Sequence, residues 1–351
     1  MGGEGRILTE RELNRALLAR QMLLERDRGP IPKVVDCMGT LQAQYAPSMY
    51  IGLWSRMEGF EREQLDRMLE RRAVAQGTLM RGTIHLVSRA DYWPAALGVR
   101  RSRREAWLKA RIRRPYSPAQ MSALARKLRA RLGDGTMNRR EIHELLGSDS
   151  VITNGVNLWL DLVRVPPSGT WERRRADLYA AADRWLGPAP ELKESDGIEL
   201  LVRRYLGAFG PASLTEIANW AGIPPKRLQP VLGRLQLRSF SAEDGTELLD
   251  LLRAPLPDPE APAPVRFLPT WDAALLVHAR RTGILPEEHR PKVFNAKTPQ
   301  SVSTFLIDGR VAGTWSYEKG KVRTEPFGKL GAADLRALRE EADRLAELHT
   351  D

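Results

Sequence analysis

Apolar residues recur at helical spacing through the first seventy positions of the chain. A helix is expected over residues 8–25, where leucines follow one another at three- and four-residue intervals, and Gly29-Pro30 breaks it. Further helices are expected over residues 33–44, 50–57 and 61–71. The second of these ends just before Pro47, because proline disfavours helical backbone in the residue that precedes it.

The pattern then changes from helical spacing to short β-prone runs. Residues 73–80 and 83–87 are such runs, and Arg81-Gly82 joins them, which predicts a β-hairpin. A group of helices followed by a hairpin is typical of a winged helix, the DNA-binding fold in which a β-wing follows a helix-turn-helix. The first part of the chain is therefore interpreted as a winged helix.

The same order of elements recurs twice. In the second copy a helix over 117–132 precedes two shorter helices and a hairpin, expected over 136–147, 154–162 and 163–171. In the third copy Ser213 and Glu216 form a capping box at the start of a helix over 211–222. A second helix over 226–235 and a hairpin over 237–252, turning at Asp244-Gly245, complete that copy.

The last part of the chain is different in kind. A proline-rich break over 258–264 precedes β-prone runs over 265–268, 305–307 and 311–315, the last two joined by a turn at Asp308-Gly309, and an amphipathic helix over 332–349. The predicted fold class is α+β, with three tandem winged-helix domains and a small β-rich C-terminal domain. The predicted domains are residues 1–115, 116–190, 191–264 and 265–351.

The net charge of the chain indicates which kind of partner it binds. The 351 residues include 55 Lys and Arg against 44 Asp and Glu, a formal net charge of +11. A basic protein of this kind favours a polyanion such as nucleic acid. Residues 100–114 hold eight basic residues and one acidic residue. In such a basic chain we favour phosphate contact for this run over a solvated helix face.

Other classes of function find little support in the sequence. No run approaches the roughly 20 apolar residues of a membrane span, and no signal-peptide core follows the N-terminus, so a cytoplasmic protein is expected. Cys37 is the single cysteine and is expected to be buried; the five histidines lack zinc-ligand spacing. No metal and no cofactor are expected. A phosphate-binding GxxxxGK[ST] loop is also missing, which argues against an NTPase.

Several segments together resemble a known family. They are Leu41-Gln42-Ala43-Gln44, Arg81-Gly82-Thr83-Ile84-His85-Leu86, Pro166-Pro167 leading to Trp171-Glu172-Arg173-Arg174, residues 205–212, Leu268-Pro269-Thr270-Trp271-Asp272 with the four residues after it, and Gly313-Thr314-Trp315. By their order and spacing the chain resembles the AlkZ-type winged-helix DNA glycosylases of bacteria over nearly its whole length. It departs from the family at Trp271, where relatives often have Phe or another apolar residue.

The resemblance carries expectations about shape and activity. It implies three tandem winged helices and a β-barrel-like C-terminal part arranged as a C around duplex DNA. It also implies that Gln42 and Gln44 are the catalytic residues. Gln44 places the chain with the antibiotic self-resistance type rather than with the branch that has Asp at this position. The expected partner is double-stranded DNA containing alkylated purines, bound by a monomer associated with the nucleoid.

Two glutamines suit this chemistry if the leaving group is already activated. The family's substrates are N-alkylated purines, and an N7-alkylguanine is cationic, so its glycosidic bond breaks without further protonation. The amide carbonyls can hold a water molecule and direct negative dipoles at the oxocarbenium-like sugar. Because a neutral amide is a poor general base, little activity on uracil or other neutral bases is expected. No lysine adjoins the pair in sequence, so a monofunctional glycosylase is predicted, which leaves an abasic site.

Four further residues are candidates for DNA binding. His85 belongs to the family-like Thr-x-His segment, but a hydrogen-bonded structural histidine is the favoured interpretation. Arg81 at the tip of the first hairpin fits a phosphate contact or a solvated turn equally well. Arg280 and Arg281 fit either a DNA contact or a solvated helix end.

The sequence is also compatible with two functions that involve no catalysis. One is a non-catalytic winged-helix regulator that binds a single palindrome, although three wings do not suit a simple dimeric repressor. The other is a protein that binds alkylated DNA, or sequesters the drug, and releases no base. Base release from alkylated duplex separates both from a DNA glycosylase.

Overall fold

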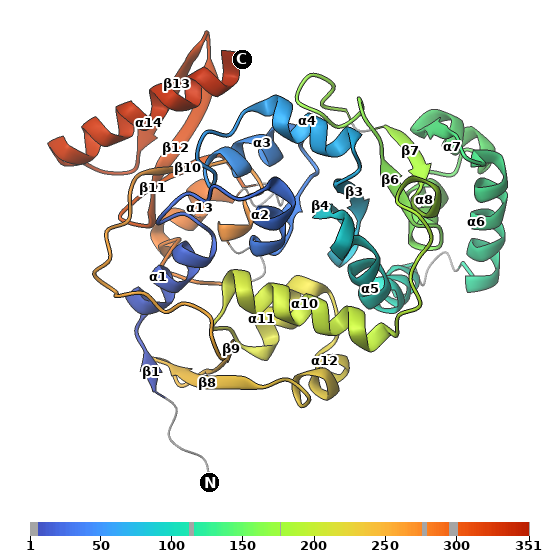
Figure 1. Ribbon diagram of the computed structural model, residues 1–351, viewed down its shortest axis with the longest axis horizontal. Helices are drawn as coiled ribbons and strands as arrows, with labels where there is room; N and C mark the ends of the chain where they lie inside the picture. The colour runs from blue at the N-terminus through green and yellow to red at the C-terminus, as the bar shows by residue number, and fades with distance from the viewer. Residues whose placement is uncertain (1–5, 112–115, 176, 276–278, 295–300, 351) are drawn as a thin grey trace.

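The computed structural model describes residues 6–111, 116–175, 177–275, 279–294 and 301–350, and shows a mixed α+β chain (Figure 1). The first segment contains β1 (Ile7–Leu8), α1 (Glu10–Arg20), α2 (Ile31–Cys37), β2 (Leu41–Gln42), α3 (Ala46–Trp54), α4 (Arg62–Glu70), β3 (Val74–Thr78), the 3₁₀ turn η1 (Met80–Gly82), β4 (Ile84–Ser88) and α5 (Arg89–Lys109). The predicted hairpin is confirmed, because β3 and β4 pair antiparallel.

The second segment packs beside the first. Its elements are α6 (Pro118–Leu132), β5 (Thr136–Asn138), α7 (Arg139–Leu145), α8 (Ser150–Gly155), η2 (Val156–Leu158), β6 (Leu162–Arg164), β7 (Leu178–Ala181) and α9 (Ala182–Trp185). One six-stranded sheet, in the order β2-β4-β3-β6-β7-β5, runs through both segments. Two register pairs, Gln76 with Arg164 and Gly77 with Val163, join β3 to β6. The predicted boundary at residues 115 and 116 therefore falls between two halves of one sheet.

The third segment lies at the bottom of Figure 1 and returns to the N-terminus. It contains α10 (Glu194–Phe209), α11 (Leu214–Ala221), α12 (Pro225–Leu232) and the hairpin of β8 (Leu237–Ala242) and β9 (Glu247–Leu251). The predicted capping box is confirmed, because Ser213 and Glu216 exchange hydrogen bonds at the start of α11. Strand β1 pairs parallel with β8, so the beginning of the chain completes this sheet.

The C-terminal segment is the second β-rich part. Strands β10 (Arg266–Leu268), β11 (Thr304–Ile307), β12 (Arg310–Glu318) and β13 (Lys321–Pro326) form an antiparallel sheet in chain order. Short turns η3 (Ala273–Leu275) and η4 (Glu287–His289) and helix α13 (Arg290–Val293) lie between β10 and β11, and α14 (Ala332–Thr350) follows β13. The three predicted strands and the terminal helix are confirmed. No described helix has the length and apolar character that crossing a membrane requires.

Two buried contacts hold these segments together. Helices α5 and α10 cross so closely that a Cβ on Gly98 would lie 2.6 Å from the carbonyl carbon of Gly197, so both positions need glycine. Arg56, which follows the end of α3, donates to both carboxylate oxygens of Asp272 at 2.8 and 2.9 Å, and both side chains are fully buried. Asp272 belongs to the Leu-Pro-x-x-Asp segment, so this segment ties the C-terminal part to the turn after α3.

Three expected elements are wrong in detail. The helix over 33–44 ends at Cys37, because Gly39 and Thr40 adopt positive φ values of 68° and 77° and turn the chain into β2. The helix over 154–162 is α8, which starts earlier, followed by η2. No hairpin forms within 163–171: β6 pairs with β7 instead, and Pro166 and Pro167 between them lack the amide N–H that a ladder needs.

Candidate active site

The glutamine pair lies at the edge of the six-stranded sheet. Gln42 is the last residue of β2, the edge strand, and its register partner on β4 is His85. Gln44 is in the short loop between β2 and α3, where Pro47 occupies the first helical turn. The pair was expected at the end of a helix; instead strand pairing holds Gln42, and Gln44 lies in the loop that follows.

Backbone hydrogen bonds fix the residue between the two glutamines. Ala43 is buried, and its amide donates to the carbonyl of Ile84 at 2.7 Å. Its carbonyl accepts from Nη1 of Arg164 at 3.2 Å. Because Ala43 points inward, the side chains of its two neighbours project the other way.

The two amides contact each other directly. Nε2 of Gln42 donates to Oε1 of Gln44; Gln42 is half-buried and Gln44 is exposed. An amide oxygen has two lone pairs, so Oε1 of Gln42 and the second lone pair of Gln44 Oε1 stay available to accept from a water molecule. The geometry therefore provides two neighbouring acceptors on a rigid edge.

Next to the pair lies an aromatic pocket that the sequence did not reveal. Tyr45 follows Gln44, and its hydroxyl accepts from Nη1 of Arg174 at 3.3 Å. Both line a cavity of ≈ 320 Å³ together with Trp171, Trp315 and other residues of β12, α3 and α14. No local pattern signals this cavity, because its walls come from three distant parts of the chain.

His85 is a structural residue in this arrangement. It is buried, with 2% of its surface exposed, and its Nδ1 lies 3.0 Å from the carbonyl oxygen of Thr83. Burial, together with the nearby charge of Arg81, lowers the pKa of His85 to about 3. The ring is therefore neutral at physiological pH, and the structure gives it no open path to a phosphate.

Arg81 makes a contact with a distant part of the chain. It has a φ of 53° in the turn between β3 and β4, and Nη1 donates to the carbonyl oxygen of Trp220 on α11. Burial lowers the pKa of its guanidinium. Arg81 is an exposed residue, and its bond at the tip of this hairpin joins the first segment to the third.

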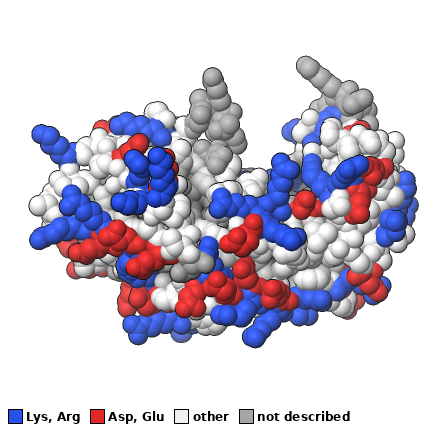
Figure 2. Space-filling view, turned by 90° about the horizontal axis from the view of Figure 1, so that it is seen from above, with Lys and Arg blue, Asp and Glu red and all other residues white. Residues whose placement is uncertain are grey.

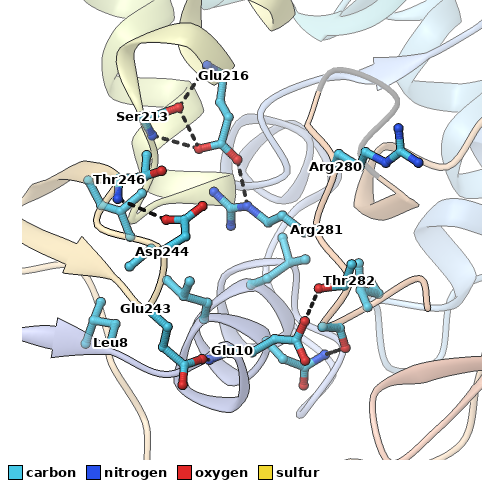
Figure 3. Close-up of a pocket in the computed structure, with 17 residues that line it drawn as sticks. Leu8, Glu10, Ser213, Glu216, Glu243, Asp244, Thr246, Arg280, Arg281 and Thr282 are labelled. Carbon is cyan, nitrogen blue, oxygen red and sulfur yellow. Dashed lines mark hydrogen bonds and ion pairs between the residues drawn. The ribbon is translucent and has the colours of Figure 1, made fainter. Parts of the chain in front are cut away.

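The neighbouring residues Arg280 and Arg281 differ in their partners and in their exposure to solvent. Arg281 bonds Oε1 of Glu216 at 2.9 Å and the carbonyl oxygens of Phe209 and Pro211 at 2.8 Å each. Arg280 turns away from that cluster and pairs with Glu287 at 2.7 Å, with 73% of its side chain exposed (Figure 3). Only Arg280 of the two presents its charge to solvent.

The pocket beside these arginines is not a phosphate site. Its volume is ≈ 360 Å³, and Glu10, Glu216, Glu243 and Asp244 are among the residues that line it (Figure 3). Carboxylates repel a phosphate. The pair Arg281 and Glu216 instead connects the C-terminal segment to α11.

Most of the described part of the basic run 100–114 is engaged inside the protein as well. Arg100 and Arg103 bond the two carboxylate oxygens of Asp161 at 2.7 and 2.5 Å. Burial alone would raise the pKa of Asp161, but these two guanidinium groups lower it. Arg104 lies over the ring of Trp159 at 5.6 Å. These three guanidinium groups therefore have partners within the chain, phosphate contact by the run stays a prediction, and residues 112–115 lie outside the described part.

Other basic side chains do gather on one face. Figure 2 shows Lys and Arg side chains close together near the middle of the face seen from above. Among the described residues no group of three His, Cys, Asp or Glu is placed to hold a metal ion. Cys37 is exposed at the last position of α2, so the expectation that it is buried is wrong.

A mixed α+β chain with a hydrogen-bonded glutamine pair on a sheet edge and a basic face has the character of a DNA-processing enzyme. The family model described as "DNA glycosylase AlkZ-like" matches residues 35–348, and the chain belongs to this family. This membership supports a DNA glycosylase that acts on DNA.

A comparison of sequences and a comparison of structures agree with that placement. A curated protein of Streptomyces sahachiroi, the interstrand DNA cross-link repair glycosylase, is 22% identical, over 94% of this chain and 93% of that protein. The solved structure of the Streptomyces sahachiroi DNA glycosylase AlkZ has a TM-score of 0.81 at 20% identity and covers 97% of both chains. The structural likeness shows that the two chains share a fold.

Proposed function

We propose that this protein is a monofunctional DNA glycosylase that hydrolyses the N-glycosidic bond of bulky or cross-linked N7-alkylpurines and leaves an abasic site. The observation that carries the proposal is the Gln42–Gln44 amide pair, held on a sheet edge by Ala43 with its carbonyl oxygens free to accept. Its biological role is DNA repair or self-resistance to a genotoxic natural product. The curated relative's name, which specifies interstrand cross-link repair, supports the cross-link part.

In the proposed mechanism the two amide oxygens accept hydrogen bonds from one water molecule beneath the anomeric carbon. The cationic base leaves with the bonding electron pair, and the positive charge develops on the sugar. The carbonyl dipoles stabilise that charge, because they are oriented before the reaction begins. The water then attacks the anomeric carbon and loses its proton to solvent, because a neutral amide is too weak a base to accept it near neutral pH.

Base release from a duplex carrying a single N7-alkylguanine tests the proposal. Strand cleavage after alkali would be compared for wild type, Gln42→Ala, Gln44→Ala and the double variant. Each single variant should lose roughly tenfold or more, about 1.4 kcal/mol of barrier. Gln236→Ala, at an exposed glutamine before β8, is the matched control and should cleave like wild type.

Two results would count against the proposal. Tight binding of alkylated duplex without base release would favour a damage-binding protein. Base release that neither glutamine affects would assign the chemistry to other residues.

A further inference from the structure

The aromatic pocket beside Gln44 differs in charge from the pocket beside Arg281. Its lining holds one guanidinium group, that of Arg174, and no Asp or Glu among the described residues. Aromatic rings form much of its wall, those of Tyr45, Trp171, Trp315, Tyr317 and His349. The other pocket has four carboxylates in its lining. The aromatic pocket is therefore the one of the two that does not repel an anion.

The environment of His349 shows the sign of the charge at this pocket. The centroid of its ring lies 4.0 Å from that of Tyr317 and 5.1 Å from that of Trp171. Burial lowers the pKa of His349 to about 4, and the positive charges of Arg62 and Arg174 contribute to the shift. The imidazole is therefore neutral at physiological pH, while the two guanidinium groups stay charged. A positive potential in a small cavity favours an anionic guest.

Arg174 is exposed and is oriented by two hydrogen bonds. Its Nε donates to the carbonyl oxygen of Trp171 at 3.4 Å, and its Nη1 donates to the hydroxyl of Tyr45 at 3.3 Å. A guanidinium group carries five N–H groups, and within the described residues the others bind no carboxylate and no further acceptor. Because the Tyr45 hydroxyl accepts from Arg174, its own hydrogen is available for donation. The two side chains thus present several donors side by side.

An arginine next to a tyrosine hydroxyl is a suitable pair of ligands for a DNA phosphate, because both groups donate to its oxygens. Tyr45 follows Gln44 with extended backbone, so the two side chains leave the chain on opposite sides. Strand β2, which precedes them, is the edge of its sheet. A DNA strand along the open side of this edge can therefore present a sugar to the glutamines and a phosphate to Arg174.

We propose that Arg174 and Tyr45 bind one backbone phosphate of the DNA strand that carries the lesion, close to the alkylated nucleotide. This inference rests on the proposed function, because it takes alkylated duplex as the substrate. The phosphate contact fixes the position of this strand along the sheet edge, and the rings of the pocket pack against the neighbouring sugar. Because the contact is made to the backbone, it does not require a bulky or cross-linked base to leave the duplex.

Replacement of single phosphates by methylphosphonate tests the contact, because each replacement removes one negative charge. The duplex carries a 2′-fluorinated N7-methylguanine, whose glycosidic bond resists hydrolysis, so the test does not depend on catalysis. The replacement is moved one phosphate at a time along both strands around the lesion. Fluorescence anisotropy of a distal dye gives the affinity of wild type for each duplex. The contacted phosphate should show a loss of roughly tenfold, as expected for a hydrogen-bonded charge.

Two variants assign that phosphate to the pair. Arg174→Met removes the charge at similar side-chain length, and the loss at one phosphate of the lesion strand should disappear while losses at other phosphates stay. Tyr45→Phe removes a single oxygen atom and should reduce the loss at the same phosphate, so it decides the test should Arg174→Met fail to fold. Arg173→Met, at the exposed arginine one residue earlier, is the matched control and should keep the loss at that phosphate.

The outcomes separate this inference from the proposed function. Base release from ordinary N7-methylguanine, with a phosphate pattern that neither variant changes, would overturn the inference and leave the glycosylase standing. A loss that disappears in Arg174→Met, without base release by wild type, would support the phosphate contact and contradict the glycosylase. A loss that disappears only on the strand facing the lesion would also overturn the inference, because Arg174 would then bind the other strand.

Discussion

The glutamine pair and the pair of Arg281 with Glu216 are both clusters of polar side chains, but they differ in where their atoms find partners. Arg281 fills its donors with one carboxylate and two carbonyls of the same chain. Gln42 and Gln44 bond only each other among the hydrogen bonds seen and leave acceptors open at the surface. Polar groups with a full internal set of partners build the scaffold, whereas groups with open atoms are available to a substrate.

The largest effect should come from breaking the scaffold pair. Glu216→Ala leaves Arg281 buried without its carboxylate, which costs about 3–5 kcal/mol of unfolding free energy. Urea unfolding of wild type and variant measures this. The double variant Glu216→Leu with Arg281→Met should recover part of the loss, because no charge stays buried. A loss below about 1 kcal/mol would show that the pair is not structural.

A second scaffold test uses pH. Burial holds the pKa of His85 at about 3, below the value of about 6.5 expected in the unfolded chain. Between these values the unfolded chain binds a proton that the folded chain does not, so stability falls as pH is lowered. The contribution of His85 reaches about 1.4 kcal/mol per pH unit. Unfolding free energies at pH 7, 6 and 5 should therefore decline less steeply for His85→Gln than for wild type; equal slopes would contradict the buried neutral ring.

At the glutamine pair the expected changes concern activity rather than stability. Gln44→Asp places a carboxylate near the developing cation and should keep base release within about tenfold of wild type. The kcat/KM of this variant should fall as the pH is lowered toward the carboxylate pKa of about 3.9. The kcat/KM of wild type should not change over the same range. Gln44→Asn, of the same length but neutral, is the control and should lack this pH dependence. Identical profiles for both variants would place Gln44 away from the reacting sugar.

The smallest effect should come from the exposed arginine. Arg280→Ala removes a solvent-screened pair with Glu287 and should leave stability essentially unchanged. If Arg280 contacts a phosphate, the slope of log affinity against log salt should decrease by about 0.9. Fluorescence anisotropy of labelled duplex at several salt concentrations measures this slope. An unchanged slope would remove Arg280 from the DNA-binding surface.

Local patterns in the sequence predict much of this fold. The capping box at Ser213 and the turn at Asp244-Gly245 are local signals, and the structure confirms the elements they bound. The pairing of β6 with β7 is not local, since a loop with two prolines separates the strands. The end of α2 depends on Gly39, whose close contact with Ala208 of α10 no local pattern encodes.

The candidate site was harder to derive from residue types. Resemblance to a family located Gln42 and Gln44, which composition alone would not have done. A count of positive charge cannot tell Arg280 from Arg281, because the difference is a carboxylate from another segment. Arg164 had one signal: the alternation Val163-Arg164-Val165 places its side chain on the face opposite to two buried valines.

The pairing of β3 with β6 limits which mutations this protein can tolerate during evolution. Its two register pairs set which side chains face a cavity that Gln76, Ile84 and Arg164 help to line. A single inserted or deleted residue in β6 would turn Arg164 to the opposite face and Val163 into the cavity. Substitutions at this joint alter one contact at a time, whereas a change of length exchanges a whole row of side chains. Lineages of this protein should therefore vary the identity of residues 162–164 while keeping their number.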